Sequence, residues 1–117
     1  MEKYELIIST NLKNLGVPVS LTGYQYLKYA ICLMVEDMSL VNCGITKILY
    51  PTIAKHFETT PSRVERAIRH AIEVSWCRAN PKIQDEFFGY TVDVVKGKPT
   101  NSEFIATVAD FIRMTLV

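Results

Sequence analysis

Apolar residues recur at helical spacing along most of this chain, and this periodicity restricts the fold more than any other feature of the sequence. The first stripe, at i, i+3, i+4 spacing, consists of Tyr4, Ile7, Ile8, Leu12 and Leu15. Gly16 and Pro18 follow it, and both residue types are typical of a helix end because proline cannot continue a helix. Since the pattern repeats through the chain, the sequence predicts an all-α fold.

Start and stop signals place further helices at 22–38, 46–57, 61–78 and 83–88, and a last helix after the capping box that begins at Thr100. Pro51 lies inside the range 46–57, so we expect either two short helices that meet near Tyr50 or one helix kinked there. A turn is expected at 42–44. The β-branched residues at 90–95 predict an extended segment or a short strand.

The 117 residues fit a single domain spanning 1–117, and the net charge of +1 is no overall basic excess. A chain with this balance that binds nucleic acid must gather its positive charge on one face. Cys32, Cys43 and Cys77 are spaced too widely for a zinc site, and neither histidine completes a ligand set. We therefore expect no metal, no cofactor, and reduced, mostly buried thiols.

The helices on either side of Glu58–Thr60 carry the pattern of a helix-turn-helix motif. Ala54 suits the small position of the first helix, where the second helix crosses closely, and Val64 suits the apolar position about ten residues later. Thr60 and Pro61 are the expected N-cap and first residue of the second helix. The turn of this motif often contains glycine, which is absent here.

One face of the second motif helix is apolar and is expected to belong to the core. Its members are Val64, Ala67, Ile68, Ala71, Ile72 and Ser75, with Trp76 at the edge. The opposite face consists of Ser62, Glu65, Arg66, Arg69 and Glu73. Arginine matches guanine O6 and N7, glutamate accepts from cytosine N4, and each good contact contributes about 1–3 kcal/mol of base discrimination. This face predicts a helix that reads bases in the major groove of duplex DNA.

An ordinary solvated helix shows a similar face. Glu65 and Arg69, like Arg69 and Glu73, are four residues apart, and such ion pairs contribute only about 0.2–0.5 kcal/mol each. The pattern leaves both interpretations of the helix open. Trp76 and Tyr50 flank apolar stripes, so we expect them in the core and not as stacking platforms for single-stranded nucleic acid.

Polar residues around the motif are candidates for contacts with the DNA backbone. They are Thr46, Lys47, Lys55, Thr59, Thr60, Ser62, His70 and Arg78. The backbone amides at the start of the second helix also face a phosphate in this motif. Each of these side chains is equally compatible with ordinary protein surface.

Long ungapped segments resemble the DNA-binding effector domain of the stage-zero sporulation response regulator, the master regulator of endospore formation. These segments are Ile45–Pro51, Ser62–Val74, Phe88–Val92 and Lys98–Ala106, and the likeness extends over about residues 5–113. The resemblance implies a six-helix domain with a helix-turn-helix that binds short operator boxes, often in tandem. It also implies activation or repression through contact with RNA polymerase and its sigma factor.

The resemblance also assigns roles to particular residues. It assigns base reading to Glu65, Arg66 and Arg69, and the opening of the reading helix to Ser62 and Arg63. The last helix, with Ala109 and Asp110, matches a region tied to dimer contacts and transcriptional control. The chain is thus expected to be a DNA-binding transcription regulator in the bacterial cytoplasm, associated with the nucleoid.

Three features depart from the family pattern. The family's regulator carries a phosphoacceptor receiver domain that this sequence lacks, so we expect either an excised effector domain or a stand-alone relative. The segment from Ser39 to Gly44 is about one residue longer than the family's loop, which weakens the expectation of polymerase contacts there. Thr22 stands where a lysine is usual, which removes one candidate phosphate contact.

A protein-interaction module is the alternative class of function. Such a module keeps the fold without reading DNA, for instance as an antagonist of the full-length regulator. An enzyme is not expected, because the sequence shows no nucleophile–base pair, carboxylate dyad or phosphate-binding loop. A membrane span is not expected either, since the longest apolar run, around 29–35, is too short.

Overall fold

The computed structural model describes residues 2–40, 44–89 and 97–116, and these residues form helices and connecting turns without a strand. The elements are α1 (Glu2–Asn14), α2 (Thr22–Glu36), the π-helix η1 (Ile45–Leu49), α4 (Tyr50–His56), α5 (Pro61–Arg78), α6 (Pro81–Phe88) and α7 (Asn101–Thr115). The described part of the chain thus contains six α-helices, which confirms the predicted all-α, six-helix fold.

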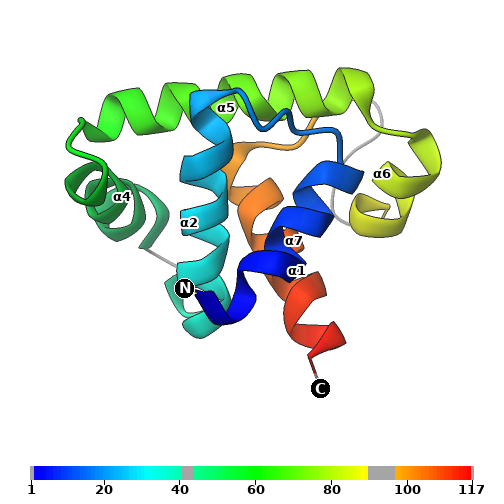
Figure 1. Cartoon of the computed structure of the whole chain (residues 1–117), viewed down its shortest axis with the longest axis horizontal. Helices are drawn as coiled ribbons and strands as arrows, with labels where there is room; N and C mark the ends of the chain where they lie inside the picture. Colours follow the sequence, from blue (N-terminus) through cyan, green and yellow to red (C-terminus); the bar gives the residue numbers. More distant parts are fainter. Residues whose placement is uncertain (1, 41–43, 90–96, 117) are drawn as a thin grey trace.

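The central helix of the domain is α2, which packs against α1, α5 and α7 (Figure 1). Its inward side chains include Leu27, Ala30, Ile31 and Met34, all fully buried. An isolated helix of about 15 residues is marginal in water, so this apolar burial on several sides is what stabilises α2. The hydrophobic core therefore forms around this helix.

The N-terminal turn of α2 lies directly against α5, and Gly23 permits this close approach. A Cβ atom at Gly23 would lie 2.2 Å from the carbonyl oxygen of Ala67 and 2.8 Å from its carbonyl carbon. No side chain fits there, because real Cβ atoms essentially never approach other heavy atoms within 3.0 Å. Glycine at this position therefore sets the distance between the central helix and α5.

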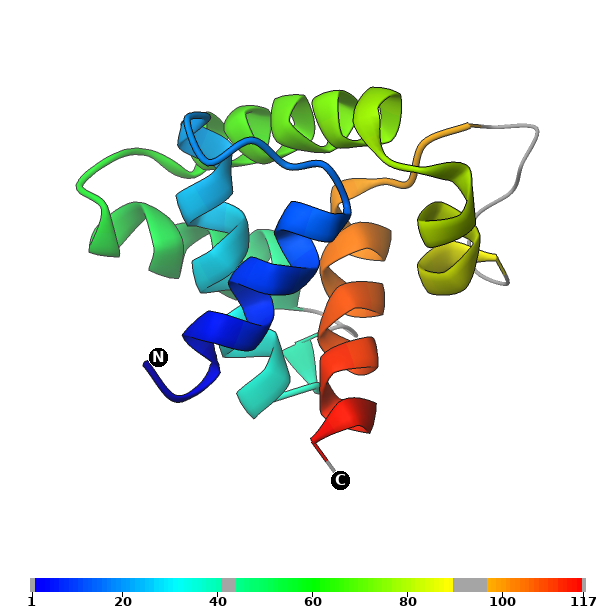
Figure 2. The same cartoon turned by 45° about the vertical axis from the view of Figure 1, so that its right-hand side comes forward.

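One side of the domain is formed by α5, which lies across α2, α4 and the start of α7 (Figure 1). The first turn of α1 and the last turn of α7 lie on the opposite side. Figure 2 shows α6 beside the C-terminal end of α5, and α1 crossing in front of α2 towards α7. The outer face of α5 is consequently open to solvent along most of its length.

Most helix ends follow the sequence signals. Gly16 ends the first helical segment with a φ of 79°, a left-handed conformation that glycine adopts without strain. Thr60 caps α5 by accepting a hydrogen bond of 3.3 Å from the N–H of Arg63, and α5 has the predicted bounds. Thr100 forms the predicted capping box with Glu103.

The start of α6 differs from the prediction by two residues. The helix begins at Pro81 and not at Ile83. The reason is that Asn80 acts as an N-cap, its side chain accepting a hydrogen bond of 2.8 Å from the N–H of Lys82. Proline suits the first helical position, where its missing N–H costs nothing, so Asn80 and Pro81 together start the helix.

The end of α2 also differs, since the helix stops at Glu36 and not near Met38. Asp37 leaves the helical conformation with a φ of −145°. Its carboxylate accepts hydrogen bonds from the hydroxyl and the backbone N–H of Ser39, and these bonds lower the pKa of Asp37. A local polar turn therefore competes with the last turn of the helix.

Of the two alternatives at Pro51, the structure confirms two short helical segments that meet at Tyr50. The π-helix η1 runs directly into α4, with the N–H of Tyr50 donating to the carbonyl of Ile45 five residues back. Pro51 lies in the first turn of α4, where its missing N–H is least costly. The hydroxyl of Thr52 donates to the carbonyl of Ile48 at 2.7 Å, within the same stretch.

Some predictions fall wholly or partly outside the described residues. The extended segment at 90–95 lies there, as do the first two residues of the turn at 42–44. The expectation of mostly buried thiols holds for Cys32 and is wrong for Cys77, which is exposed on the last turn of α5. Within the described ranges, no helix is both long and apolar enough to span a bilayer.

Candidate nucleic-acid interface

The two motif helices, α4 and α5, form a helix-turn-helix whose turn opens with a Schellman motif. The N–H of Thr59 donates to the carbonyl of Ala54 at 2.9 Å, and the N–H of Glu58 to the carbonyl of Lys55 at 3.4 Å. Glu58 therefore occupies the left-handed position of this motif, with a φ of 56°. Glycine is the usual residue there, so a strained glutamate performs the role of the missing turn glycine.

The interior of the motif matches the sequence pattern. Ala54 is 3% exposed, and Val64, Ile53 and Ile68 are fully buried, while Phe57 is partly buried against them. The predicted core face of α5 is confirmed at Val64, Ile68, Ala71, Ile72 and Ser75, with Ala67 and Trp76 partly buried at its edges. This packing turns the opposite face of α5 towards solvent.

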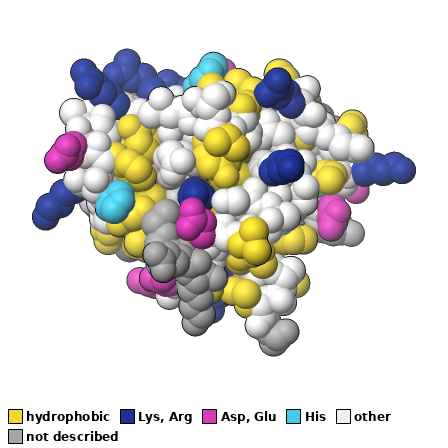
Figure 3. Space-filling view, in the orientation of Figure 1, with side chains coloured by type: hydrophobic (Ala, Val, Ile, Leu, Met, Phe, Trp, Pro, Cys, Tyr) yellow, Lys and Arg dark blue, Asp and Glu magenta, His cyan; other side chains and the backbone are white. Residues whose placement is uncertain are grey.

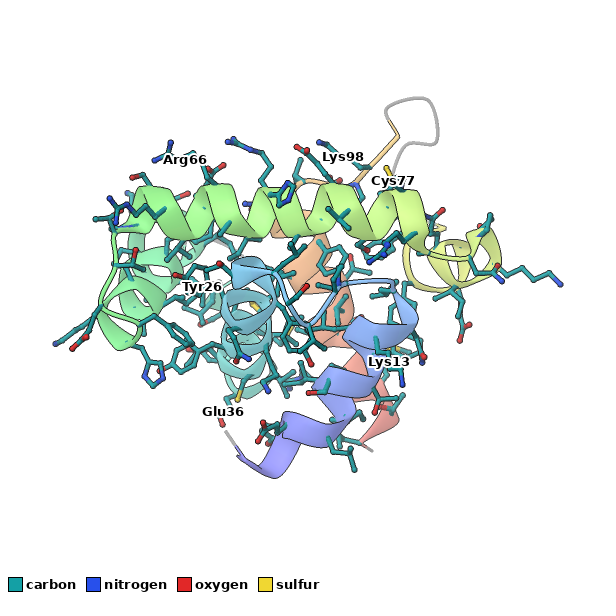
Figure 4. All side chains as sticks on the ribbon, turned by 45° about the horizontal axis from the view of Figure 1, so that its top comes forward. Lys13, Tyr26, Glu36, Arg66, Cys77 and Lys98 are labelled. Carbon is teal, nitrogen blue, oxygen red and sulfur yellow. The ribbon has the colours of Figure 1, made fainter. Side chains whose placement is uncertain are left out.

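The outer face of α5 carries the predicted base-reading residues. Arg66 and Arg69 are exposed, whereas the side chain of Glu65 is only 33% exposed. Figure 4 shows Arg66 projecting away from the other helices, and Figure 3 shows lysine and arginine side chains along the edge of the domain where α5 lies. The structure thus brings the three residues together on adjacent turns of one helix.

Of the two predicted i, i+4 ion pairs on α5, one forms. Arg69 Nη1 lies 2.9 Å from Glu65 Oε1. Glu73 pairs with Lys98 instead, at 2.7 Å, and the hydrogen bond and charge of this lysine lower the pKa of Glu73. Both pairs are largely exposed, so each contributes little to stability and opens readily for another anion.

The first two arginines of α5 are not neutralised by carboxylates. Among the described residues, neither Arg63 nor Arg66 forms an ion pair. The Nε of Arg66 donates to the carbonyl of Ser62 at 3.5 Å, which leaves its charge uncompensated. The N-terminus of a helix adds partial positive charge. Positive charge is thus concentrated at this end of α5, although the whole chain carries only +1.

The candidate backbone-contact residues surround α5 unevenly. Exposed ones are Thr46, Lys47, Lys55, Thr60, Ser62, Arg63, His70 and Arg78, and Thr59 is half-buried. Thr46 lines the same cleft as Glu65 and Arg69. Arg78 lies about 18 Å further along the helix axis than Arg66, in a groove that it lines with Lys13. The structure therefore brings Thr46 beside Glu65 and Arg69 and leaves Arg78 at the far end of α5.

A cleft of about 410 Å³, lined mostly by polar residues, lies beside Glu65 and Arg69, between η1, α5 and the start of α7. Asn101 lines this cleft, and its Nδ2 donates to the hydroxyl of Tyr50 at 3.0 Å and to the carbonyl of Glu65 at 3.1 Å. Tyr50 is buried, as predicted, and burial raises the pKa of its hydroxyl, which is therefore protonated at neutral pH.

The contact of Asn101 with α5 has no signal in the sequence. Asn101 is recognisable there only as a member of the capping box. Its two partners lie 51 and 36 positions away, so no local pattern relates them. The Glu73–Lys98 pair is non-local in the same way.

The last helix presents only one of its two predicted contact residues. Ala109 is fully buried in the core, whereas Asp110 is exposed. A direct contact with a second molecule is therefore open to Asp110 and not to the side chain of Ala109. Within the described part of the chain, no group of three or more metal-ligating side chains comes together.

In a helix-turn-helix the second helix enters the major groove, and the outer face of α5 is open for such an approach. The fold and this surface place the domain in the class of helix-turn-helix DNA-binding regulators. Over residues 8–112 the sequence matches the family model described as "Sporulation initiation factor Spo0A C terminal". The chain belongs to this family, the C-terminal DNA-binding domain of the sporulation initiation factor, which confirms the resemblance seen in the sequence.

Proposed function

We propose that the chain is a sequence-specific transcription regulator of sporulation initiation and that α5 reads operator boxes in the major groove of duplex DNA. The observation that carries the proposal is the pair Arg66 and Arg69, exposed on adjacent turns of α5 in a domain of a DNA-binding family. Arginine bound to guanine O6 and N7 is the commonest specific contact in the major groove. An α-helix is about 10–12 Å in diameter and the groove is about 12 Å wide.

Base reading in this proposal comes from Glu65, Arg66 and Arg69. The 2.9 Å pair between Arg69 and Glu65 is largely exposed and opens when the two side chains turn to the bases. A second set contacts the DNA backbone and fixes the register of the domain without carrying sequence information. This set consists of Thr46, Lys47, Lys55, Thr59, Thr60, Ser62, Arg63, His70 and Arg78.

A homodimer on DNA is a further part of the proposal. The domain measures 36 × 31 × 27 Å, and one turn of duplex spans about 34 Å. If the longest axis lies along the duplex, two domains on tandem boxes one turn apart come into contact, and we propose that exposed Asp110 lies near that contact. From the family we also propose contact with RNA polymerase and its sigma factor, and a location at the nucleoid in the bacterial cytoplasm.

The test of base reading compares two DNA probes by fluorescence anisotropy: a duplex selected from a random-sequence pool by the unchanged chain, and a scrambled duplex of equal composition. Arg66→Ala and Arg69→Ala should each weaken binding to the selected duplex by about 1–3 kcal/mol. Lys82→Ala removes an exposed cation of α6 and serves as the matched control, with no change expected. Unchanged affinity in both arginine variants would refute the assignment.

Salt dependence separates DNA reading from the alternative of a protein-interaction module. For a reader, log K should fall with log salt at a slope of about −0.9 for each phosphate contacted. Absent or salt-insensitive DNA binding, together with tight binding to the full-length regulator, would favour the antagonist instead. Removal of a cationic backbone-contact residue, such as Lys47, Lys55 or Arg63, should make the slope less steep by about one unit, whereas removal of a neutral one, such as Thr46, should leave the slope unchanged.

A further inference from the structure

The start of α7 is connected to α5 by the side chain of Asn101, which is not one of the proposed base-reading residues. Asn101 donates to the hydroxyl of Tyr50 at 3.0 Å and to the backbone carbonyl of Glu65 at 3.1 Å. A side-chain amide has two N–H donors, and both are used here. Since Tyr50 belongs to α4 and Glu65 to α5, one residue bridges three helices. Figure 1 shows the start of α7 passing beneath α5.

Apolar packing stabilises α5 on the domain but leaves its exact rotation weakly specified. Val64 and Ile68 are fully buried. Their contribution to stability depends on the apolar area removed from water and hardly on the orientation of the helix. Hydrogen bonds, in contrast, have preferred lengths and angles. In the described part of the chain, the bond from Asn101 is the one side-chain hydrogen bond that residues 61–70 receive from another helix. The remaining side-chain bonds of that segment join α5 to itself or to its N-cap.

The carbonyl that Asn101 contacts belongs to the turn that carries the readers. In an α-helix the carbonyl of Glu65 accepts from the N–H of Arg69, and Arg66 follows Glu65 directly. A shift of this carbonyl therefore moves the backbone of both arginines. A bidentate contact with guanine requires two hydrogen bonds of good geometry at once, whereas flexible side chains follow a displaced phosphate more easily.

We propose that Asn101 is a positioning residue for base reading. By donating to both the carbonyl of Glu65 and the hydroxyl of Tyr50, it sets the place of Arg66 and Arg69 in the groove. It thereby determines how well the domain distinguishes its operator from other DNA, and it contributes little to affinity for DNA in general. This inference rests on the proposed function, because it requires α5 to read bases.

The experiment measures the affinity ratio between the selected duplex and the scrambled duplex at one salt concentration, and the urea stability of each variant. Asn101→Ala should lower the ratio by about threefold to tenfold, the range expected from lost hydrogen bonds, while the affinity for scrambled DNA stays unchanged. Tyr50→Phe removes one oxygen from the junction, keeps the buried ring, and should lower the ratio by a smaller factor. Ser102→Ala is the matched control, since Ser102 is an exposed neighbour in the same cleft.

A purely structural role would lower urea stability and leave the ratio unchanged. An unchanged ratio in Asn101→Ala therefore overturns the proposal, whatever its stability. If Asn101→Ala fails to fold, Tyr50→Phe decides, and an unchanged ratio there also overturns it. An equal loss in Ser102→Ala overturns it as well. A wild-type chain that shows no discrimination refutes the proposed function itself, which distinguishes the two failures.

Discussion

Replacing Gly23 by alanine tests how closely α5 is set against the centre of the domain. Gly23 lies in the first turn of α2, and α5 passes directly over it. The added methyl group would stand 2.2 Å from the carbonyl oxygen of Ala67 and 2.8 Å from the Cβ of Ala71. These atoms belong to α5 and cannot rotate away as the end of a flexible side chain would.

The magnitude follows from this geometry. Relief of the 2.2 Å contact requires α5 to move outwards by about 1 Å, because real Cβ atoms essentially never approach other heavy atoms within 3.0 Å. Overpacking of this kind typically costs about 1–3 kcal/mol. Alanine has a helix propensity better than that of glycine by at most about 1 kcal/mol, which offsets part of the cost. We expect Gly23→Ala to destabilise the domain by about 1–2 kcal/mol and to lower Tm by about 4–8 °C.

The assay is urea denaturation followed by circular dichroism, with Gln25→Ala as the control. Gln25 is exposed on the same helix, so its replacement should change stability by no more than about 0.5 kcal/mol. Because Ala67 lies between Arg66 and Arg69, the displaced helix should also bind the selected duplex more weakly. A Gly23→Ala variant as stable as the unchanged chain would show that the two helices are not held at this distance.

Three further predictions concern local features. Glu58→Gly should raise stability by about 0.5–1 kcal/mol, because glycine adopts a positive φ without strain. Glu58→Val should lower stability, because valine at a positive φ is strained more than glutamate. The reverse order of stability in urea titrations would contradict this. Thr100→Ala should cost about 1 kcal/mol through the lost cap of α7, whereas Thr100→Ser should keep most of it in thermal melts. Lys98 lowers the pKa of Glu73 in the folded domain. The pair therefore stabilises the domain fully above pH ~4.3, the usual pKa of glutamate. The stabilisation is lost as pH falls through the lowered pKa of Glu73 in the folded state. Glu73→Gln should therefore reduce the drop in denaturation midpoint between pH ~6 and pH ~3, and an unaltered drop would contradict the assignment.

Local signals predicted α5 with its bounds. Thr60 and Pro61 act on the backbone within one turn, through a side-chain cap and a fixed φ, so their effect does not depend on the remainder of the fold. Helical periodicity then decided that Arg66 and Arg69 face away from Val64 and Ile68. The chemistry of the candidate site was for this reason visible in the sequence.

Where two local preferences competed, the sequence left the outcome open. Pro51 indicated a disturbance, yet two short helices and one kinked helix were equally compatible with the pattern. In the folded domain Leu49 and Ile53 are both fully buried on either side of the proline, which a continuous helical path permits. Likewise, Glu58 takes a left-handed conformation that its own preference opposes, because α4 and α5 must meet at the angle that buries their shared apolar face.

The sequence by itself thus determined the helices, the outward face of α5 and the residue types on it, since these depend on interactions over three or four positions. Only the tertiary structure decided that Asn101 holds the turn of Glu65, that Glu73 pairs with Lys98 and not with Arg69, and that Gly23 admits α5. Those contacts join residues 25 to 44 positions apart. Residues so distant in the chain meet only when the whole core packs, and no local pattern encodes which side chains will then be neighbours.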